Sequence, residues 1–142
     1  MSLERFKRAL VSIQENDTVE RAARLMADRG VGCVLVVRQD RPLGLVTDRD
    51  LVVRVLARGV DPGGARIGEY VTYDPITLQL NEGIETAAHY MRVHGVRRLP
   101  IVDDEGKVVG IVTADDLLVL LGEELAGVCG AIANRSDATE SV

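Results

Sequence analysis

The sequence predicts an α+β fold built from two copies of one β-α-β-β-α unit. The prediction rests on an internal repeat, on the hydrophobic spacing inside each copy, and on an aliphatic composition. Hydrophobic residues make up 46% of the 142 residues, yet there are only three Tyr, one Phe and no Trp. Val, Leu, Ile and Ala must therefore supply most of the core.

The internal repeat appears when residues 19–37 are aligned with residues 84–102. At a constant offset of 65, seven of these 19 positions are identical, Gly30 and Gly95 among them. One inserted residue then raises the offset to 66, where GLVTDRDL at 44–51 matches GIVTADDL at 110–117. Identities in one order at two nearly equal offsets indicate a tandem duplication.

Each copy is predicted to contain the same elements in the same order. A short strand comes first, then an amphipathic helix, a hairpin of two strands and a second helix. Asp17 and Glu20 fit a capping box at the start of the first helix, and Gly30 and Gly95 suit helix C-termini. The first helix of each copy is predicted at 18–29 and 83–94, and the second helix is predicted to begin near 48 and 114. The predicted strands lie at 10–14, 33–38, 43–47, 76–80, 98–102 and 108–113.

The repeat also sets the domain boundaries. A unit of about 50 residues buries little surface on its own, so we expect the two copies to share one core. We place the first copy at residues 1–60, a linker and lead-in at 61–75, the second copy at 76–126, and a partly disordered C-terminal extension at 127–142.

Composition and charge disfavour several classes of protein. The net charge is −5 and no block of Lys or Arg is present, so nucleic acid is not an expected partner. The apolar stretches are shorter than the roughly 20 residues of a membrane-spanning helix. The N-terminal residues contain no apolar signal segment, and two cysteines give neither a disulfide framework nor metal-ligand spacing. We therefore expect a cytoplasmic protein without a membrane partner or a metal site.

The repeated segment G-[LI]-V-T-x-x-D carries the strongest chemical signal. In each copy it ends a strand and begins a helix, and a helix N-terminus attracts anions such as phosphate. Thr47 and Thr113 add hydroxyl groups there, while Asp50 and Asp116 could accept two hydrogen bonds from a ribose diol. The same pattern fits a plain capping box, so a purely structural role stays open.

Basic residues flank both of these corners. Arg97 and Arg98 enter the strand beside the second corner, where one of them could clamp a phosphate or both could be a solvated surface pair. The matching positions of the first copy are Gly32 and Cys33, and Arg49 supplies the positive charge there. The two corners are therefore not equivalent.

Nothing in the sequence favours catalysis. No Ser or Cys stands in a recognisable arrangement with His and Asp, and no Gly-rich loop of the nucleotide-hydrolase or dinucleotide type is present. We expect no catalytic residue, no required cofactor and no enzyme activity.

Taken together, these motifs resemble a tandem pair of cystathionine-β-synthase-type (CBS) domains. The resemblance rests on the two copies of G-[LI]-V-T-x-x-D-L and on GVRRLPIVD-x-x-G in the second copy, and it covers about residues 10–125. It implies two small sheets that face each other with helices outside, and two clefts between the copies. In many members these clefts bind AMP, ADP, ATP, NAD-type cofactors or S-adenosylmethionine, and Mg²⁺ can bind together with the nucleotide.

The resemblance also implies which residues contact the ligand. The motif Thr and Asp would hold phosphate and ribose, Arg98 would hold phosphate, and the first strand of the opposite copy would complete each cleft. The implied ligand-binding residues are Thr47, Asp50, Arg49, Thr72 and Tyr73 in one cleft, and Thr113, Asp116, Arg97, Arg98, Val11 and Ser12 in the other.

The first copy departs from the family pattern. Leu35 replaces the strand proline, and no basic residue stands two positions before it. Residues 3–10 also match residues 67–75 poorly. We therefore expect the second corner to be the better phosphate site.

By resemblance, the chain is expected to be a regulatory module for energy sensing that acts on an unknown regulated protein. A homodimer is implied as well, with an apolar helix face at residues 117–125 as its contact surface. The alternative is a ligand-free structural or interaction module in which the T-x-x-D segments only cap helices.

Overall fold

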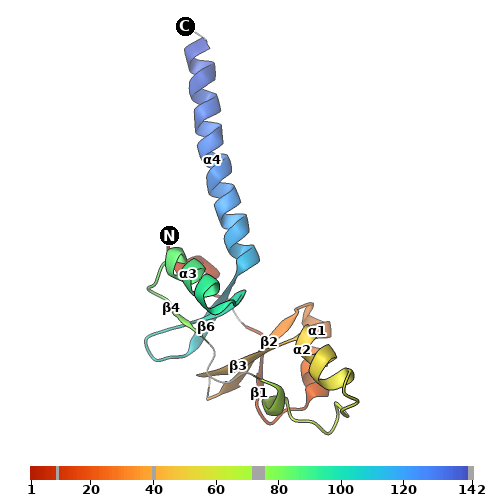
Figure 1. The fold of residues 1–142 in the computed structure, drawn as a ribbon. Helices are drawn as coiled ribbons and strands as arrows, with labels where there is room; N and C mark the ends of the chain where they lie inside the picture. The colour runs from red at the N-terminus through yellow and green to blue at the C-terminus, as the bar shows by residue number, and fades with distance from the viewer. Residues whose placement is uncertain (9, 40, 72–75, 141–142) are drawn as a thin grey trace.

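The computed structural model describes residues 1–8, 10–39, 41–71 and 76–140 (Figure 1). These residues form two three-stranded sheets. In each sheet the first strand pairs in parallel with the middle strand, and the middle strand pairs antiparallel with the last. The predicted α+β fold is confirmed. The strands are β1 (Ser12–Gln14), β2 (Cys33–Arg38) and β3 (Arg41–Thr47) in one sheet, and β4 (Leu78–Gln79), β5 (Arg98–Val102) and β6 (Val108–Thr113) in the other.

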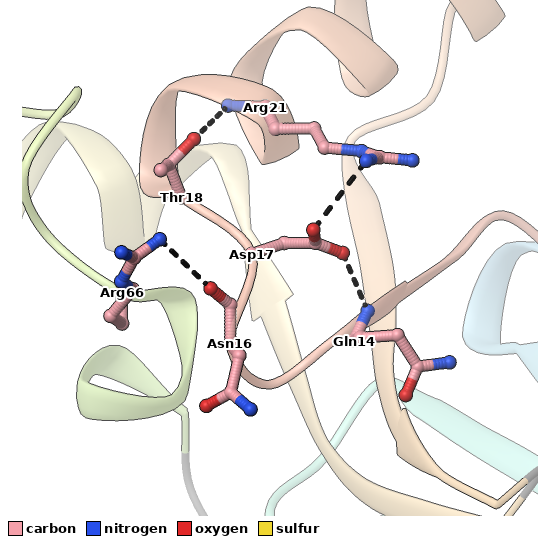
Figure 2. Close-up of polar contacts among 6 residues, drawn as sticks. All are labelled: Gln14, Asn16, Asp17, Thr18, Arg21 and Arg66. Carbon is pink, nitrogen blue, oxygen red and sulfur yellow. Dashed lines mark hydrogen bonds and ion pairs between the residues drawn. The ribbon is translucent and has the colours of Figure 1, made fainter.

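The connecting helices α1 (Val19–Arg29) and α3 (Ile84–His94) end as predicted, because Gly30 and Gly95 adopt left-handed φ values of 62° and 64°. The start of α1 differs from the prediction. Thr18, and not Asp17, is the N-cap, and its side chain accepts a hydrogen bond from the Arg21 amide (Figure 2).

Asp17 is not free for capping because its carboxylate stabilises the preceding turn. Its Oδ2 atom accepts a hydrogen bond of 3.0 Å from the Gln14 amide, and its Oδ1 atom lies 3.5 Å from the Arg21 guanidinium (Figure 2). With two polar residues side by side, the sequence pattern alone does not decide which one caps the helix.

The second helices of the two copies differ in length. In the first copy, α2 (Asp48–Asp50) continues into π-helical turns at Leu51–Leu56. In the second copy, α4 (Ala114–Glu140) has 27 residues and extends away from the body of the molecule (Figure 1). Residues 127–140, which we placed in a C-terminal extension, thus continue α4. Within the described ranges, no helix has the length and apolarity needed to cross a membrane.

Two hydrophobic clusters form in place of the single shared core that we expected, and each copy supplies part of the other's cluster. The segment before each first strand, its lead-in, crosses to the opposite copy. The first lead-in (residues 1–8) places Leu3 and Phe6 among the buried residues of the second copy. The second lead-in (residues 61–71) places Ile67 and Val71 among those of the first copy. The two copies therefore exchange their lead-ins.

Backbone hydrogen bonds hold both exchanged segments. The Arg8 amide donates to the Val109 carbonyl at 3.1 Å, and the Ile67 amide donates to the Asp17 carbonyl at 2.8 Å. The Arg66 side chain adds a hydrogen bond of 3.1 Å to the Asn16 carbonyl (Figure 2). Each lead-in contains a short 3₁₀ helix, at Leu3–Phe6 and at Ile67–Tyr70. The two segments are structurally equivalent despite their poor sequence match.

Candidate functional site

The second corner forms where β6 ends and α4 begins. The Thr113 amide donates to Asp116 Oδ2 at 3.0 Å, and the Asp116 amide donates to Thr113 Oγ1 at 3.0 Å. These reciprocal bonds are a capping box. They hold both side chains, which are half-buried, at the place where the motif predicted a ligand contact.

Asp116 has a second partner that the sequence did not indicate. The Arg8 guanidinium donates to Asp116 Oδ2 at 3.3 Å, from a residue 108 positions earlier in the chain. Arg8 reaches Asp116 because the first lead-in lies against the second copy. Its importance becomes visible only once the exchange of the lead-ins is known, since no motif contains it.

A cleft of about 360 Å³ lies between the two copies beside this corner. That volume is at the lower end of the range for small-molecule sites. Arg8, Arg98 and Thr113 are its polar lining residues, while most other lining residues are apolar. The remaining lining residues are Leu10, Val11, Val31, Gly32, Cys33, Leu35, Leu45 and Ile111.

The two arginines of the second corner have different surroundings. Arg98 is half-buried and lines both the main cleft and an adjoining pocket of about 260 Å³. Arg97 lines the adjoining pocket but not the main cleft. Its guanidinium lies 3.5 Å from the Asp115 carboxylate. Both members of that pair are about four-fifths exposed, so the pair contributes little to stability.

Gly32 of the first copy lies beside the side chain of Arg98. A Cβ atom at Gly32 would stand 3.7 Å from the Arg98 guanidinium and 3.4 Å from the Asp48 carboxylate. The first copy thus has glycine where the second copy has Arg97. The side chain beside this glycine is Arg98, which belongs to the second copy. The cleft therefore combines groups from both copies.

Cys33 contributes an uncharged thiol to the cleft. Burial raises the pKa of the Cys33 thiol, Arg98 and Arg8 lower it by their positive charges, and Asp48 raises it. Burial is the largest of these effects, so the thiol stays protonated near neutral pH. A protonated thiol is a poor nucleophile, and Cys33 acts here as a small wall residue.

The model of the CBS domain matches the chain twice, at residues 4–57 and 67–123. The chain belongs to the CBS domain family. The matches begin inside the two lead-ins and include residues 4–8 of the first and 67–71 of the second.

Several known proteins are similar to this CBS pair. It is 35% identical over 113 residues to an uncharacterized protein of Methanopyrus kandleri, covering 79% of this chain but only 58% of that protein. It is 37% identical over 119 residues to the CBS domain-containing protein YhcV of Bacillus subtilis, covering 83% and 84% of the two chains. A CBS domain protein of Pyrobaculum aerophilum, solved in complex with AMP, has a TM-score of 0.74 and 29% identity, covering 89% and 98%.

The predicted residues of the second CBS cleft come together only in part. Val11, Thr113 and Arg98 line the main cleft, and Asp116 is bonded to Thr113 and Arg8. Ser12 lines a neighbouring pocket of about 310 Å³. Leu10 lines both pockets, whereas Val11 lines only the main cleft of these two and Ser12 only the neighbouring pocket.

The first CBS corner is built in the same way. The Thr47 amide donates to Asp50 Oδ2 at 2.9 Å, and the Asp50 amide donates to Thr47 Oγ1 at 3.1 Å. Arg49 is exposed on α2. Thr72 and Tyr73, which we expected in this cleft, lie outside the described residues.

Proposed function

We propose that this CBS pair is a regulatory module that binds an adenosine-containing nucleotide in the cleft beside Thr113 and Asp116. One observation carries the proposal. Val11, Arg98 and Thr113 are distant in the sequence, yet they line a single cleft, and these are residues that the family resemblance assigned to one ligand. The AMP bound by the similar Pyrobaculum protein supports the same class of ligand.

The chemistry of the cleft suits the parts of such a nucleotide. Apolar walls that include Leu45 and Ile111 would receive the adenine ring, and the Arg98 guanidinium would bind a phosphate. Asp116 would accept hydrogen bonds from the ribose hydroxyls. Because both copies line the cleft, a bound nucleotide would contact both and stabilise their relative arrangement. A regulated protein in the cytoplasm would bind differently to the two arrangements, and the module would thereby respond to the energy state of the cell.

Thermal unfolding tests the proposal directly. The protein is unfolded with AMP, ADP, ATP, NAD or S-adenosylmethionine at millimolar concentration, each with and without Mg²⁺. A ligand at 100 times its Kd adds about 2.7 kcal/mol to the free energy of unfolding, which raises the Tm of a domain of this size by several degrees. No shift with any of the five compounds would contradict the proposal.

Replacing Asp116 by Asn should separate ligand binding from stability. Asn keeps the shape and can still cap α4, so the free energy of unfolding should fall by no more than about 1 kcal/mol. Nucleotide affinity should fall at least about tenfold, because the ribose loses a charged acceptor. Isothermal titration calorimetry measures this. The control that should keep its affinity is Asp17→Asn, because the Asp17 carboxylate also accepts a backbone amide but does not line the cleft. Equal affinities for wild type and Asp116→Asn would contradict the assigned role.

A second candidate function is a ligand-free interaction module. Its supporting observation is that both T-x-x-D segments close complete capping boxes with their own backbone. In that case Asp50→Asn and Asp116→Asn would lower stability alike, and no nucleotide would raise the Tm.

We further propose that the protein forms a homodimer through α4. Of the face expected at residues 117–125, Leu117 is buried in the body of the protein at 6% exposure, so the surface available to a second copy is narrower than expected. Leu118, Leu121 and Leu125 are 51–68% exposed and recur at intervals of three and four, the spacing of a helix-pairing seam. Sedimentation equilibrium should give twice the 15.4 kDa chain mass.

The double variant Leu121→Glu, Leu125→Glu should sediment as a monomer, because it places charges on the seam. Ala126→Glu, one position beyond the seam on the same helix, should remain dimeric. A wild-type protein that stays monomeric at millimolar concentration would contradict this part of the proposal.

A further inference from the structure

We infer that Arg8 selects the ligand of this cleft by its charge: it is the internal counter-ion of Asp116, and it transfers to the phosphates of a bound nucleotide. The cleft would then favour adenosine ligands with two or more phosphates over uncharged nucleosides. This inference rests on the proposed function and adds a residue that no sequence motif contains.

The backbone of Arg8 is fixed while its side chain reaches the corner. Lys7 forms a β-bridge with Gly110, and the Arg8 amide donates to the Val109 carbonyl at 3.1 Å. The first lead-in is thereby fastened to the edge strand β6. From this anchored position the guanidinium lines the cleft and contacts Asp116 Oδ2 at 3.3 Å.

The ion pair between Arg8 and Asp116 is suited to exchange. Its side chains are 46% and 28% exposed, so water screens the attraction and separating the two charges is inexpensive. The Oδ2 atom that Arg8 contacts also accepts the Thr113 amide. A ribose hydroxyl that approaches this same oxygen therefore competes with Arg8 for it.

The outcome of that competition depends on the charge of the ligand. An uncharged nucleoside that draws Asp116 away leaves the Arg8 guanidinium without its anion. A phosphate chain supplies a replacement anion, and planar guanidinium groups bind phosphate oxygens in pairs. The transfer is therefore favourable only for a ligand that carries phosphate.

Two guanidinium groups share the cleft, so each could bind one phosphate of a diphosphate. Arg8 and Arg98 both line it, and the positive charges of both act on the Cys33 thiol in the same wall, lowering its pKa against the larger effect of burial. Arg97, by contrast, is paired with Asp115. Two guanidinium groups at one cleft match a diphosphate or triphosphate better than a monophosphate.

The test compares ligands that differ only in phosphate number. Calorimetric Kd values are measured for adenosine, AMP, ADP and ATP with wild type, Arg8→Gln and Arg5→Gln. Arg5 is the matched control because it lies in the same lead-in, pairs with Glu123 at 3.7 Å, and is absent from the residues that line the cleft.

Wild type and Arg5→Gln should bind more tightly as phosphates are added. Arg8→Gln should bind ADP and ATP about tenfold more weakly, whereas its affinity for adenosine should hold or rise because Asp116 has lost its competitor. An equal loss for all four ligands would show that Arg8 only tethers the lead-in and would overturn the inference, as would unchanged affinities. If none of the four binds to wild type but NAD or S-adenosylmethionine raises the Tm, this inference fails and the proposed function stands; if no compound binds, both fail.

Discussion

Alanine at position 110 should destabilise the protein by about 3 kcal/mol, because the first lead-in passes directly over Gly110. A Cβ atom there would overlap the Phe6 carbonyl oxygen and stand 3.1 Å from the Lys7 Cα atom. The obstructing atoms belong to backbone that is itself paired with β6, so they cannot rotate aside as a side chain would. Overpacking of this kind costs about 1–3 kcal/mol, and urea unfolding would measure it.

Gly122→Ala is the matched control for this substitution. Nothing lies within 4 Å of a Cβ atom at Gly122, which is inside α4. Alanine there should raise helix stability by about 0.5–1 kcal/mol. If Gly110→Ala proved as harmless as Gly122→Ala, the contact between the first lead-in and β6 would be wrong.

Truncating Leu3 to Ala should lower the free energy of unfolding by about 2–5 kcal/mol, a loss usual for the centre of a core. Residues this close to a chain end are ordinarily poorly ordered. Leu3, however, is 0% exposed and packs in the second hydrophobic cluster with residues such as Leu99 and Ile101. Removing its side chain leaves a cavity among atoms of the opposite copy.

Chemical denaturation measured at several protein concentrations checks the effect of Leu3→Ala. The control is Leu56→Ala, the same chemical change at a position that is 74% exposed, which should cost less than about 1 kcal/mol. Similar losses for the two variants would contradict the exchange of the lead-ins, since only that exchange buries Leu3.

Local elements were predictable because their signals are local. Strands β2, β5 and β6 have the predicted bounds, since each is a short apolar run next to glycine or turn residues. The ends of α1 and α3 follow from Gly30 and Gly95, whose left-handed conformations the structure confirms. Because the chain is a repeat, the order of elements predicted in one copy could be checked against the order predicted in the other.

Tertiary features were less predictable. Whether Asp17 or Thr18 caps α1 depends on the turn after β1, where Asp17 bonds to the Gln14 amide. The exchange of the lead-ins has no local signal, because Leu3 and Ile67 read equally well as core residues of their own copy. The prediction of a single shared core was wrong for this reason. The contact between Arg8 and Asp116 was not predicted for the same reason, because it depends on the exchange.

The candidate site was predictable where the motif itself supplies the residues. Thr113, Asp116 and Arg98 meet at one corner because they flank the same strand-to-helix turn and its neighbouring strand. Their ligand roles stay predictions. Residues that come from the opposite copy depend on strand register, which placed Val11 in the main cleft and Ser12 in the neighbouring pocket.

The exchanged lead-ins also bear on how this duplicated chain could have arisen. In a single ancestral copy, the lead-in would have packed against a second molecule, and the lead-in of that molecule would have packed against the first, as in a domain-swapped dimer. Its stability would then have varied with concentration. Joining two copies in one chain made that exchange intramolecular, at the millimolar effective concentration typical of short linkers. Once the copies were joined, each was free to diverge, and the two now differ at equivalent positions such as Gly32 and Arg97.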